Sequence, residues 1–114
     1  MAFTPKILID TQQLTNSTAT YYTCPTATTA QANTLVLFNN HTSNVGINLF
    51  LVPSGGSAGA DTQIYDEGTN GMVLVPNETR KINLDQILTP GDTIQADAST
   101  TTVVTIRLSG VEFT

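Results

Sequence analysis

The feature that most constrains the fold is an alternation of apolar and polar side chains that recurs in short runs. The clearest example is the segment VGINLFLVP at 45–53, where Val45, Ile47, Leu49 and Leu51 share one parity. Alternate residues of an extended strand point to opposite faces, so this run predicts a strand with one buried face. Nowhere does a long run repeat with the period of about 3.6 that marks an amphipathic helix. The pattern predicts an all-β chain with very little helix.

Similar runs are separated by clusters of Gly, Pro, Asn and Asp, residues that favour turns. Many short strands in a chain of domain size predict a single antiparallel β-sandwich or a jelly-roll-like barrel of about eight strands. The extended runs lie at 6–10, 18–24, 33–40, 45–53, 61–67, 72–75, 80–84 and 93–98, with a last long run that ends at Phe113.

The sequence predicts the local structure of three segments that connect or end strands. The polar residues 39–43 predict a tight turn, so that the runs 33–40 and 45–53 form a central antiparallel hairpin. The segment TATTAQA at 26–32 has no usable period and is expected to be a crossover loop. Residues 85–88 are compatible with one helical turn.

The last run changes parity near its end. Its apolar residues up to Leu108 share one parity, whereas Val111 and Phe113 have the other. One extra residue in a strand shifts the register by one, and glycine tolerates the backbone angles that such a bulge needs. We therefore expect a β-bulge at Gly110 that returns Val111 and Phe113 to the buried face.

The length of 114 residues suits one domain. We expect residues 1–5 to form an extended N-terminal arm and residues 6–114 to form a single β-sandwich domain. Within it, the stretch PSGGSAGA at 53–60 predicts a mobile loop of small residues. Thr, which favours pleated surfaces, accounts for 21 residues and supports the assignment to sheet.

Charge and hydropathy exclude two classes of partner. The net charge is −5, and the four cations, Lys6, Arg80, Lys81 and Arg107, form no run, so we expect no nucleic-acid binding. The apolar runs are interrupted by Asn within a few residues and predict no membrane span. The N-terminus lacks the basic region and long apolar stretch of a signal peptide, which predicts synthesis in the cytoplasm.

Candidate nucleophiles are few. With one Cys24 and one His41, nucleophilic catalysis would need a Cys24–His41 pair or a Ser–His41 pair. His41 lies in an Asn-rich turn and is expected to be an exposed polar residue. Cys24 has no neighbouring cation and is expected to be a small buried hydrophobic residue. These residues predict a protein that is not an enzyme and has no catalytic site.

The sequence also contains no clear signal for a metal or cofactor site. Cys and His are too few for zinc. Asp61, Asp66 and Glu67 gather in the sequence, but their spacing matches no EF-hand loop, and a solvated acidic edge is the interpretation we favour over calcium binding. Adjacent carboxylates in a strand point to opposite faces, which argues against glycoside hydrolysis. We expect no metal and no cofactor.

Several stretches of the sequence resemble small β-sandwich virion proteins of tailed bacteriophages. They are the N-terminus MAFTPKILID, the run TATYYTCPTATTAQANTLVLFNN followed by VGINLFLVPSGGSA, and the turn TPGDTIQADAS before a final strand rich in Thr and Val. The resemblance covers most of the chain in the order of its elements, and its motifs consist of common residues. It implies a capsid cement or decoration protein of the virion, made in the host cytoplasm, that binds the major capsid protein and stabilises the shell.

The same resemblance leaves a tail, collar or fibre component open, and it transfers no catalytic residue. We expect a homo-oligomer, specifically a trimer, because capsid axes impose symmetry and a small sandwich must cover its edges. The expected interface residues are Phe3, Thr4, Pro5, Ser54, Gly55, Gly56 and Ser57.

The alternative from a different class is a carbohydrate-binding module of the adhesin type. It would stack a sugar on a tyrosine, because the sequence contains no Trp. Tyr21 or Tyr65 would serve, with Asn and Asp partners, although we expect two of the three candidates to be half-buried strand residues. The candidates are Tyr21, Tyr22 and Tyr65.

Overall fold

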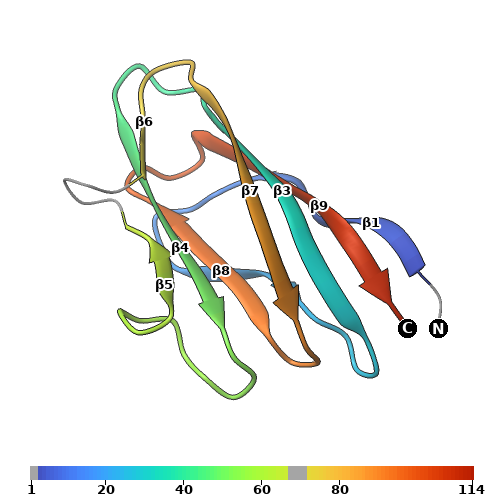
Figure 1. Ribbon diagram of the computed structural model, residues 1–114. Coiled ribbons are helices and arrows are strands. Elements are labelled where there is room, and N and C mark those ends of the chain that lie inside the picture. Colours follow the sequence, from blue (N-terminus) through green and yellow to red (C-terminus); the bar gives the residue numbers. More distant parts are fainter. Residues whose placement is uncertain (1–2, 67–71) are drawn as a thin grey trace.

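The computed structural model describes residues 3–66 and 72–114, and all regular structure in these ranges is β-strand (Figure 1). Nine strands are found in the described ranges. They are β1 (Phe3–Gln13), β2 (Ala19–Thr23), β3 (Thr29–Asn39), β4 (Val45–Val52), β5 (Gln63–Tyr65), β6 (Met72–Leu74), β7 (Thr79–Leu88), β8 (Thr93–Ala98) and β9 (Val104–Phe113).

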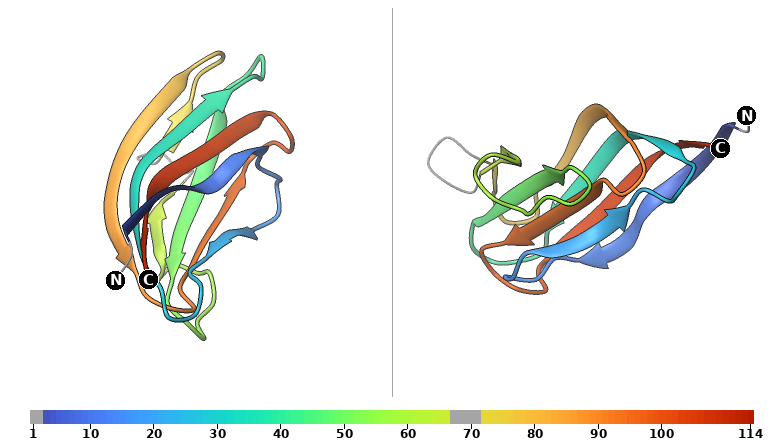
Figure 2. Two further views of the ribbon diagram at one scale, coloured as in Figure 1. Left: turned by 90° about the vertical axis from the view of Figure 1, so that its right-hand side faces the viewer. Right: turned by 90° about the horizontal axis from the view of Figure 1, so that it is seen from below.

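The strands form two antiparallel sheets that pack face to face (Figure 2). Sheet A has the strand order β1-β9-β3-β7. Sheet B has the order β2-β8-β4-β5, and β6 also pairs with β4. The predicted all-β sandwich is confirmed, with one strand more than the approximate number expected.

The core lies between the sheets and is built by the alternation seen in the sequence. Val45, Ile47 and Leu49 of β4 are buried, and the same holds for the inner residues of β9 up to Leu108. Branched apolar side chains from the two inner faces interdigitate in a layer about 10 Å thick. The large side chains buried almost completely are Ile9, Leu14, Leu35, Leu37, Val45, Ile47, Leu49, Leu74, Ile94, Val104, Ile106 and Leu108.

The expected central hairpin of residues 33–40 and 45–53 is wrong. β3 pairs with β7 and β9 in sheet A, whereas β4 pairs with β5, β6 and β8 in sheet B. The polar residues 39–43 therefore carry the chain from one sheet to the other. In β3 the buried residues Leu35 and Leu37 face the core, and in β4 Val45, Ile47 and Leu49 do.

The side chain of Asn39 holds this crossing in place. Asn39 is completely buried, and its amide nitrogen donates to the carbonyl oxygens of Ser43, Leu74 and Val75 at 3.0–3.2 Å. Its amide oxygen accepts a hydrogen bond from the backbone N–H of His41 at 2.8 Å. A buried amide needs such partners, and here they come from both the β3–β4 and the β6–β7 connections.

Two further expectations about local structure are wrong. Of the expected crossover loop 26–32, residues from Thr29 onward belong to β3, where Ala30 and Ala32 are buried. Alanine gave too weak a signal for the alternation to be recognised. Residues 85–88 form no helical turn, because they continue β7 past a register shift at which Asp85 has a φ of 51°.

The N-terminal residues also differ from the expected arm. Residues 3–5 open β1, and Phe3, Thr4 and Pro5 pair with Phe113, Glu112 and Val111 of β9. Residues 1–2 lie outside the described residues, as do Glu67 and the expected turn at 68–71.

The expected bulge at Gly110 is wrong, because β9 runs through this position without interruption. The register shifts fall on its two neighbours, at Leu8 in β1 and at Asn33 in β3. Val111 therefore lies on the outer face of sheet A, and Glu112 faces inward. A Cβ built on Gly110 would overlap the backbone carbonyl oxygen of Gln31, so the close approach of β3 requires glycine here.

We predict that Gly110→Ala lowers the free energy of unfolding by about 1–3 kcal/mol, since the added methyl group must displace the backbone of β3. Gly59→Ala is the control, because a Cβ there meets only the Asp61 carboxylate, at 3.4 Å. Urea unfolding followed by circular dichroism measures both. Equal stabilities of the two variants would contradict the close approach.

Candidate interaction surface

Both expected interface segments lie at one end of the sandwich. Residues 3–5 open β1 beside the end of β9, and residues 54–57 lie in the turn after β4. Backbone hydrogen bonds between Cys24 and the pair Gly91 and Asp92 join the β2–β3 and β7–β8 connections at the same end. Figure 2 shows both termini and these turns at this end. We call it the terminal end, comprising residues 3–5, 24–28, 53–62, 89–92 and 113–114.

Asp92 fastens the turn that contains residues 54–57. Its Oδ1 accepts a hydrogen bond from the backbone N–H of Ser54 at 3.0 Å, and its Oδ2 accepts from the backbone N–H and the hydroxyl of Thr89. The backbone hydrogen bond from Thr89 is the main cause that holds the pKa of Asp92 below its usual value. The expected loop is thus a hydrogen-bonded turn at its start, and its mobility stays a prediction.

A buried carboxylate lies between the sheets near the same end. Glu112 is 7% exposed, and it accepts hydrogen bonds from the hydroxyl of Tyr22 at 2.7 Å and from Nζ of Lys6 at 3.0 Å. The hydrogen bond from Tyr22 lowers the pKa of Glu112 most; burial opposes it, and Lys6 adds to it. Burial, followed by the contact with Glu112, raises the pKa of Tyr22 well above its usual value. At neutral pH Glu112 is therefore charged and fully occupied by its two donors.

Cys24 and His41 are not brought together. Cys24 is 1% exposed, donates to the carbonyl oxygens of Thr28 and Leu88, and has a pKa raised mainly by burial, which confirms the small buried residue predicted. His41 is half-buried in the β3–β4 connection, where an exposed residue was expected. The length of β3, about 33 Å, separates the two connections. No Cys–His pair forms.

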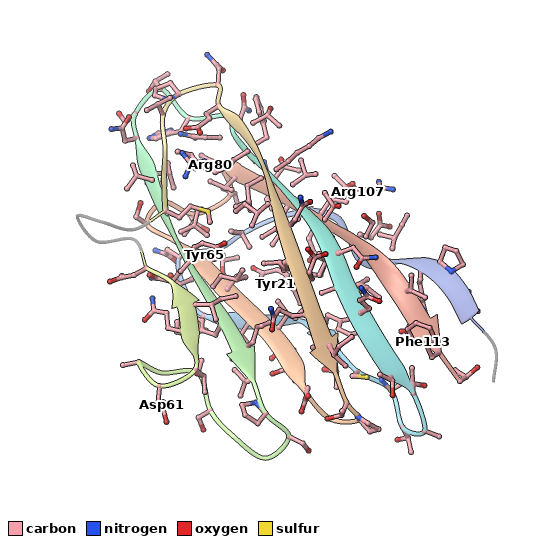
Figure 3. All side chains as sticks on the ribbon, viewed as in Figure 1. Tyr21, Asp61, Tyr65, Arg80, Arg107 and Phe113 are labelled. Carbon is pink, nitrogen blue, oxygen red and sulfur yellow. The ribbon has the colours of Figure 1, made fainter. Side chains whose placement is uncertain are left out.

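The expected acidic edge is only partly described. Asp61 and Asp66 are exposed, and Glu67 lies outside the described residues. Figure 3 shows Asp61 on the periphery, on the turn between β4 and β5. Within residues 3–66 and 72–114, no three His, Cys, Asp or Glu side chains gather in a way that would hold a metal ion. In the same ranges no helix is long and apolar enough to cross a membrane.

The tyrosines follow the prediction that two of them are half-buried. Tyr21 and Tyr65 are partly buried and pack against the core, whereas Tyr22 is buried. Tyr65 lines a groove of about 270 Å³ between the edge strands β5 and β7. The other lining residues are Leu51, Ile64, Asn83, Leu84 and Gln86.

The outer face of sheet A carries an apolar surface that sequence reasoning missed. Directly opposed residues of antiparallel strands share a face, and one such row crosses all four strands from Pro5 through Val111 and Gln31 to Ile87. This row is about 14 Å wide. Phe113 and Ile7 flank it on the neighbouring rows. We call this surface the apolar patch, comprising Pro5, Ile7, Ile87, Val111 and Phe113.

The apolar patch contains two of the large hydrophobic side chains that stand exposed in the described chain. Ile7 is 42% exposed and Ile87 is 59% exposed. The signal that could have found it is the change of parity at Gly110, which we interpreted as a bulge. Without a bulge, the same sequence places Val111 and Phe113 on the outer face of sheet A, next to the expected interface residue Pro5.

The outer face of sheet B carries a run of polar side chains, and Phe50 on the same face is only 7% exposed. The hydroxyl of Thr18 donates to Asp97, the amide of Asn48 donates to the other oxygen of Asp97, and the amide of Gln63 donates to the amide oxygen of Asn48. The four side chains form a ladder across β8, β4 and β5 that starts just before β2. The two faces of the sandwich thus differ in chemistry.

Comparison with known proteins gives no family. No family model matches the chain, and no curated protein matches it. Among solved structures, the chain is similar to one from the Gx strain of infectious bursal disease virus, with a TM-score of 0.49 and 11% identity over 97% of this chain and 30% of that chain. For the Gt strain of the same virus the TM-score is 0.46, with 11% identity over 97% of this chain and 32% of the other. The chain spans about a third of the length of those chains, and likeness at this level assigns neither family nor function.

We predict that Tyr22→Phe lowers the free energy of unfolding at neutral pH by about 1.5–3 kcal/mol, because a hydrogen bond to a buried charged group is lost. The pKa of Tyr22 in the folded protein lies above its ordinary value of 10.0, so its stabilisation is complete below that pH and is lost as the pH rises further. Tyr22→Phe should therefore lose less stability than the wild type in alkali. Urea unfolding on both sides of this pH measures the difference, and equal losses would contradict it.

For Glu112 we expect stability to depend on pH in the acidic range, and in the opposite direction. Its pKa in the folded protein lies below the ordinary value of 4.5, so its stabilisation is complete above that pH and is lost as the pH falls through the folded pKa. Glu112→Gln should be less stable than the wild type at neutral pH and lose less stability on acidification. An acid dependence unchanged by the substitution would exclude Glu112 as its source.

Proposed function

We propose that this chain is a non-enzymatic structural protein of a virus particle. More specifically, we propose a bacteriophage capsid cement or decoration protein that binds the major capsid protein and stabilises the shell. The sequence resemblance motivates the proposal. The structural observation that carries it is the apolar patch on the outer face of sheet A, which includes the expected interface residue Pro5.

Exposed apolar side chains gathered on one sheet face favour a partner that covers them. Burial stabilises by about 25 cal/mol for each Å² of apolar surface removed from water, and contiguous exposed patches mark interaction sites. Ile87 and Ile7 are the patch residues with large exposed side chains, whereas Val111 between them is 9% exposed.

Docking by a face is better supported here than pairing at the β1 edge. Pro5 lies in β1 and has no N–H to donate to an added strand. The register of β1 with β9 is also irregular near Leu8 and beyond Ile9, which twists an edge away from a regular ladder. A flat partner surface therefore fits sheet A better than an extended peptide at this edge.

The described polar groups support a binding role over catalysis. Cys24 is buried far from His41, and Glu112 is occupied by Tyr22 and Lys6. Nucleophilic catalysis requires a nucleophile, a base and an orienting group within hydrogen-bond reach of one another. In residues 3–66 and 72–114 these side chains do not form such an arrangement.

The test uses shells of the virus that encodes the chain, purified without this protein. Wild-type protein should co-sediment with the shells and raise the temperature at which they dissociate. Ile7→Thr with Ile87→Thr should reduce occupancy at least about tenfold, because the two most exposed isoleucines of the patch, one at each edge of sheet A, are lost. Both residues are exposed, so the thermal unfolding of the free protein should change little.

The matched control is Ile64→Thr with Val75→Thr, which makes the same kind of change at exposed positions outside the patch. It should bind like the wild type. Full occupancy by the Ile7/Ile87 variant would rule out the patch, and absence of wild-type binding would rule out the cement role. Deletion of residues 1–6 does not test binding alone, because residues 3–6 pair with β9 and their loss destabilises sheet A.

The groove beside Tyr65 favours a second candidate, the carbohydrate-binding module. Tyr65 lies there with the exposed amides of Asn83 and Gln86. We expect binding on a glycan array, with and without calcium, to be lost in Tyr65→Ala if this candidate holds. No binding by the wild type would exclude it. A trimer and a tail location remain proposals that sedimentation and imaging of the particle test.

A further inference from the structure

Of the four cations, two form ion pairs within the described residues and two do not. Arg80 pairs with Glu78 at 2.7 Å, and Lys6 pairs with Glu112 at 3.0 Å. Lys81 and Arg107 make no ion pair with any residue in the described ranges. Both lie opposite Val36 of β3, Lys81 from β7 and Arg107 from β9, so they share one row on the outer face of sheet A.

Three of the described carboxylates lie away from this face. Asp92, Asp97 and Glu112 are held by hydrogen bonds in the β7–β8 turn, in the polar ladder of sheet B and between the sheets. On the edge strands of sheet A, Asp10 and Asp85 are exposed, and neither is within ion-pair distance of Lys81 or Arg107. The middle row of this face is therefore positive in a protein whose net charge is −5.

The positive row borders the apolar patch. Arg107 and Val111 are four residues apart on the same face of β9, a separation of about 13 Å. Figure 3 shows Arg107 and Phe113 on sheet A, Arg107 nearer the start of β9 and Phe113 at its end. Apolar side chains beside exposed charges are the usual composition of a docking surface with its rim.

We propose that the outer face of sheet A docks onto an acidic protein surface of the virus shell. Apolar side chains of the shell cover the apolar patch, and carboxylates of the shell face Lys81 and Arg107. This proposal rests on the proposed cement function and names the face and the chemistry of its partner.

A second copy of this chain fits the face less well. Two copies joined through the same face would bring their Lys81 and Arg107 rows together, and like charges repel. The outer face of sheet B offers a second copy the polar ladder of Thr18, Asp97 and Asn48, and its Phe50 is only 7% exposed.

The test compares two variants of equal net charge on shells purified without this protein. Lys81→Gln with Arg107→Gln removes two positive charges from the face. Thr20→Glu with Thr23→Glu adds two negative charges at exposed positions opposite Gln95 and Thr93 on the outer face of sheet B. Binding is measured at low and at high salt, with circular dichroism to verify folding and analytical ultracentrifugation of the free proteins.

Lys81→Gln with Arg107→Gln should raise the Kd about fivefold at low salt and approach the wild type at high salt, because exposed ion pairs are screened. Thr20→Glu with Thr23→Glu should bind within about twofold of the wild type. Wild-type affinity for the glutamine variant, or equal weakening of both variants, would overturn the proposal while the cement function stands. Loss of binding through loss of self-association would assign the face to a second copy and would also overturn it. If wild-type protein does not bind shells at all, the cement function fails, and this inference fails with it.

Discussion

The buried side chain of Asn39 fastens the place where the two sheets are joined. The chain leaves sheet A at this residue, and a single amide binds carbonyl oxygens on both of the connections that meet there. A buried amide without partners would cost about 1–3 kcal/mol, so alternative paths for the β3–β4 connection are disfavoured. Because β3 and β4 lie in different sheets, each sheet keeps one face for the core and one for solvent. The difference in chemistry between the two outer faces depends on this division.

The second determinant is the uninterrupted course of β9. Its neighbours accommodate the irregular register, at Leu8 in β1 and Asn33 in β3, while Gly110 allows the backbone of β3 to approach. As a result Glu112 turns inward to Tyr22 and Lys6, and Val111 turns outward. One local arrangement thus produces both the buried carboxylate of Glu112 at the terminal end and the apolar patch on sheet A. The charge inside and the apolar surface outside have the same origin.

The sequence was sufficient for the fold class, because period-two alternation depends on the inner residues alone. It was sufficient for Cys24, whose surroundings contain no cation. It was insufficient for strand pairing, since the polar run at 39–43 is compatible with a hairpin and with a crossing between sheets. Only the burial of Asn39 distinguishes them, and burial of an amide has no sequence pattern. The patch was missed for a related reason: the parity change at Gly110 has two physical solutions, and the register of neighbouring strands selects between them.

The polar ladder on sheet B has a consequence of its own. Thr18, Asp97, Asn48 and Gln63 bind one another, so their donors and acceptors have little left to offer a neighbouring surface. If the outer face of sheet A is bound to the shell, the outer face of sheet B is exposed to solvent. Particles coated in this way would carry an outer layer whose ladder groups are bonded to one another, with few of them able to adhere. Resistance of whole particles to clumping would then arise from four side chains that take no part in attachment.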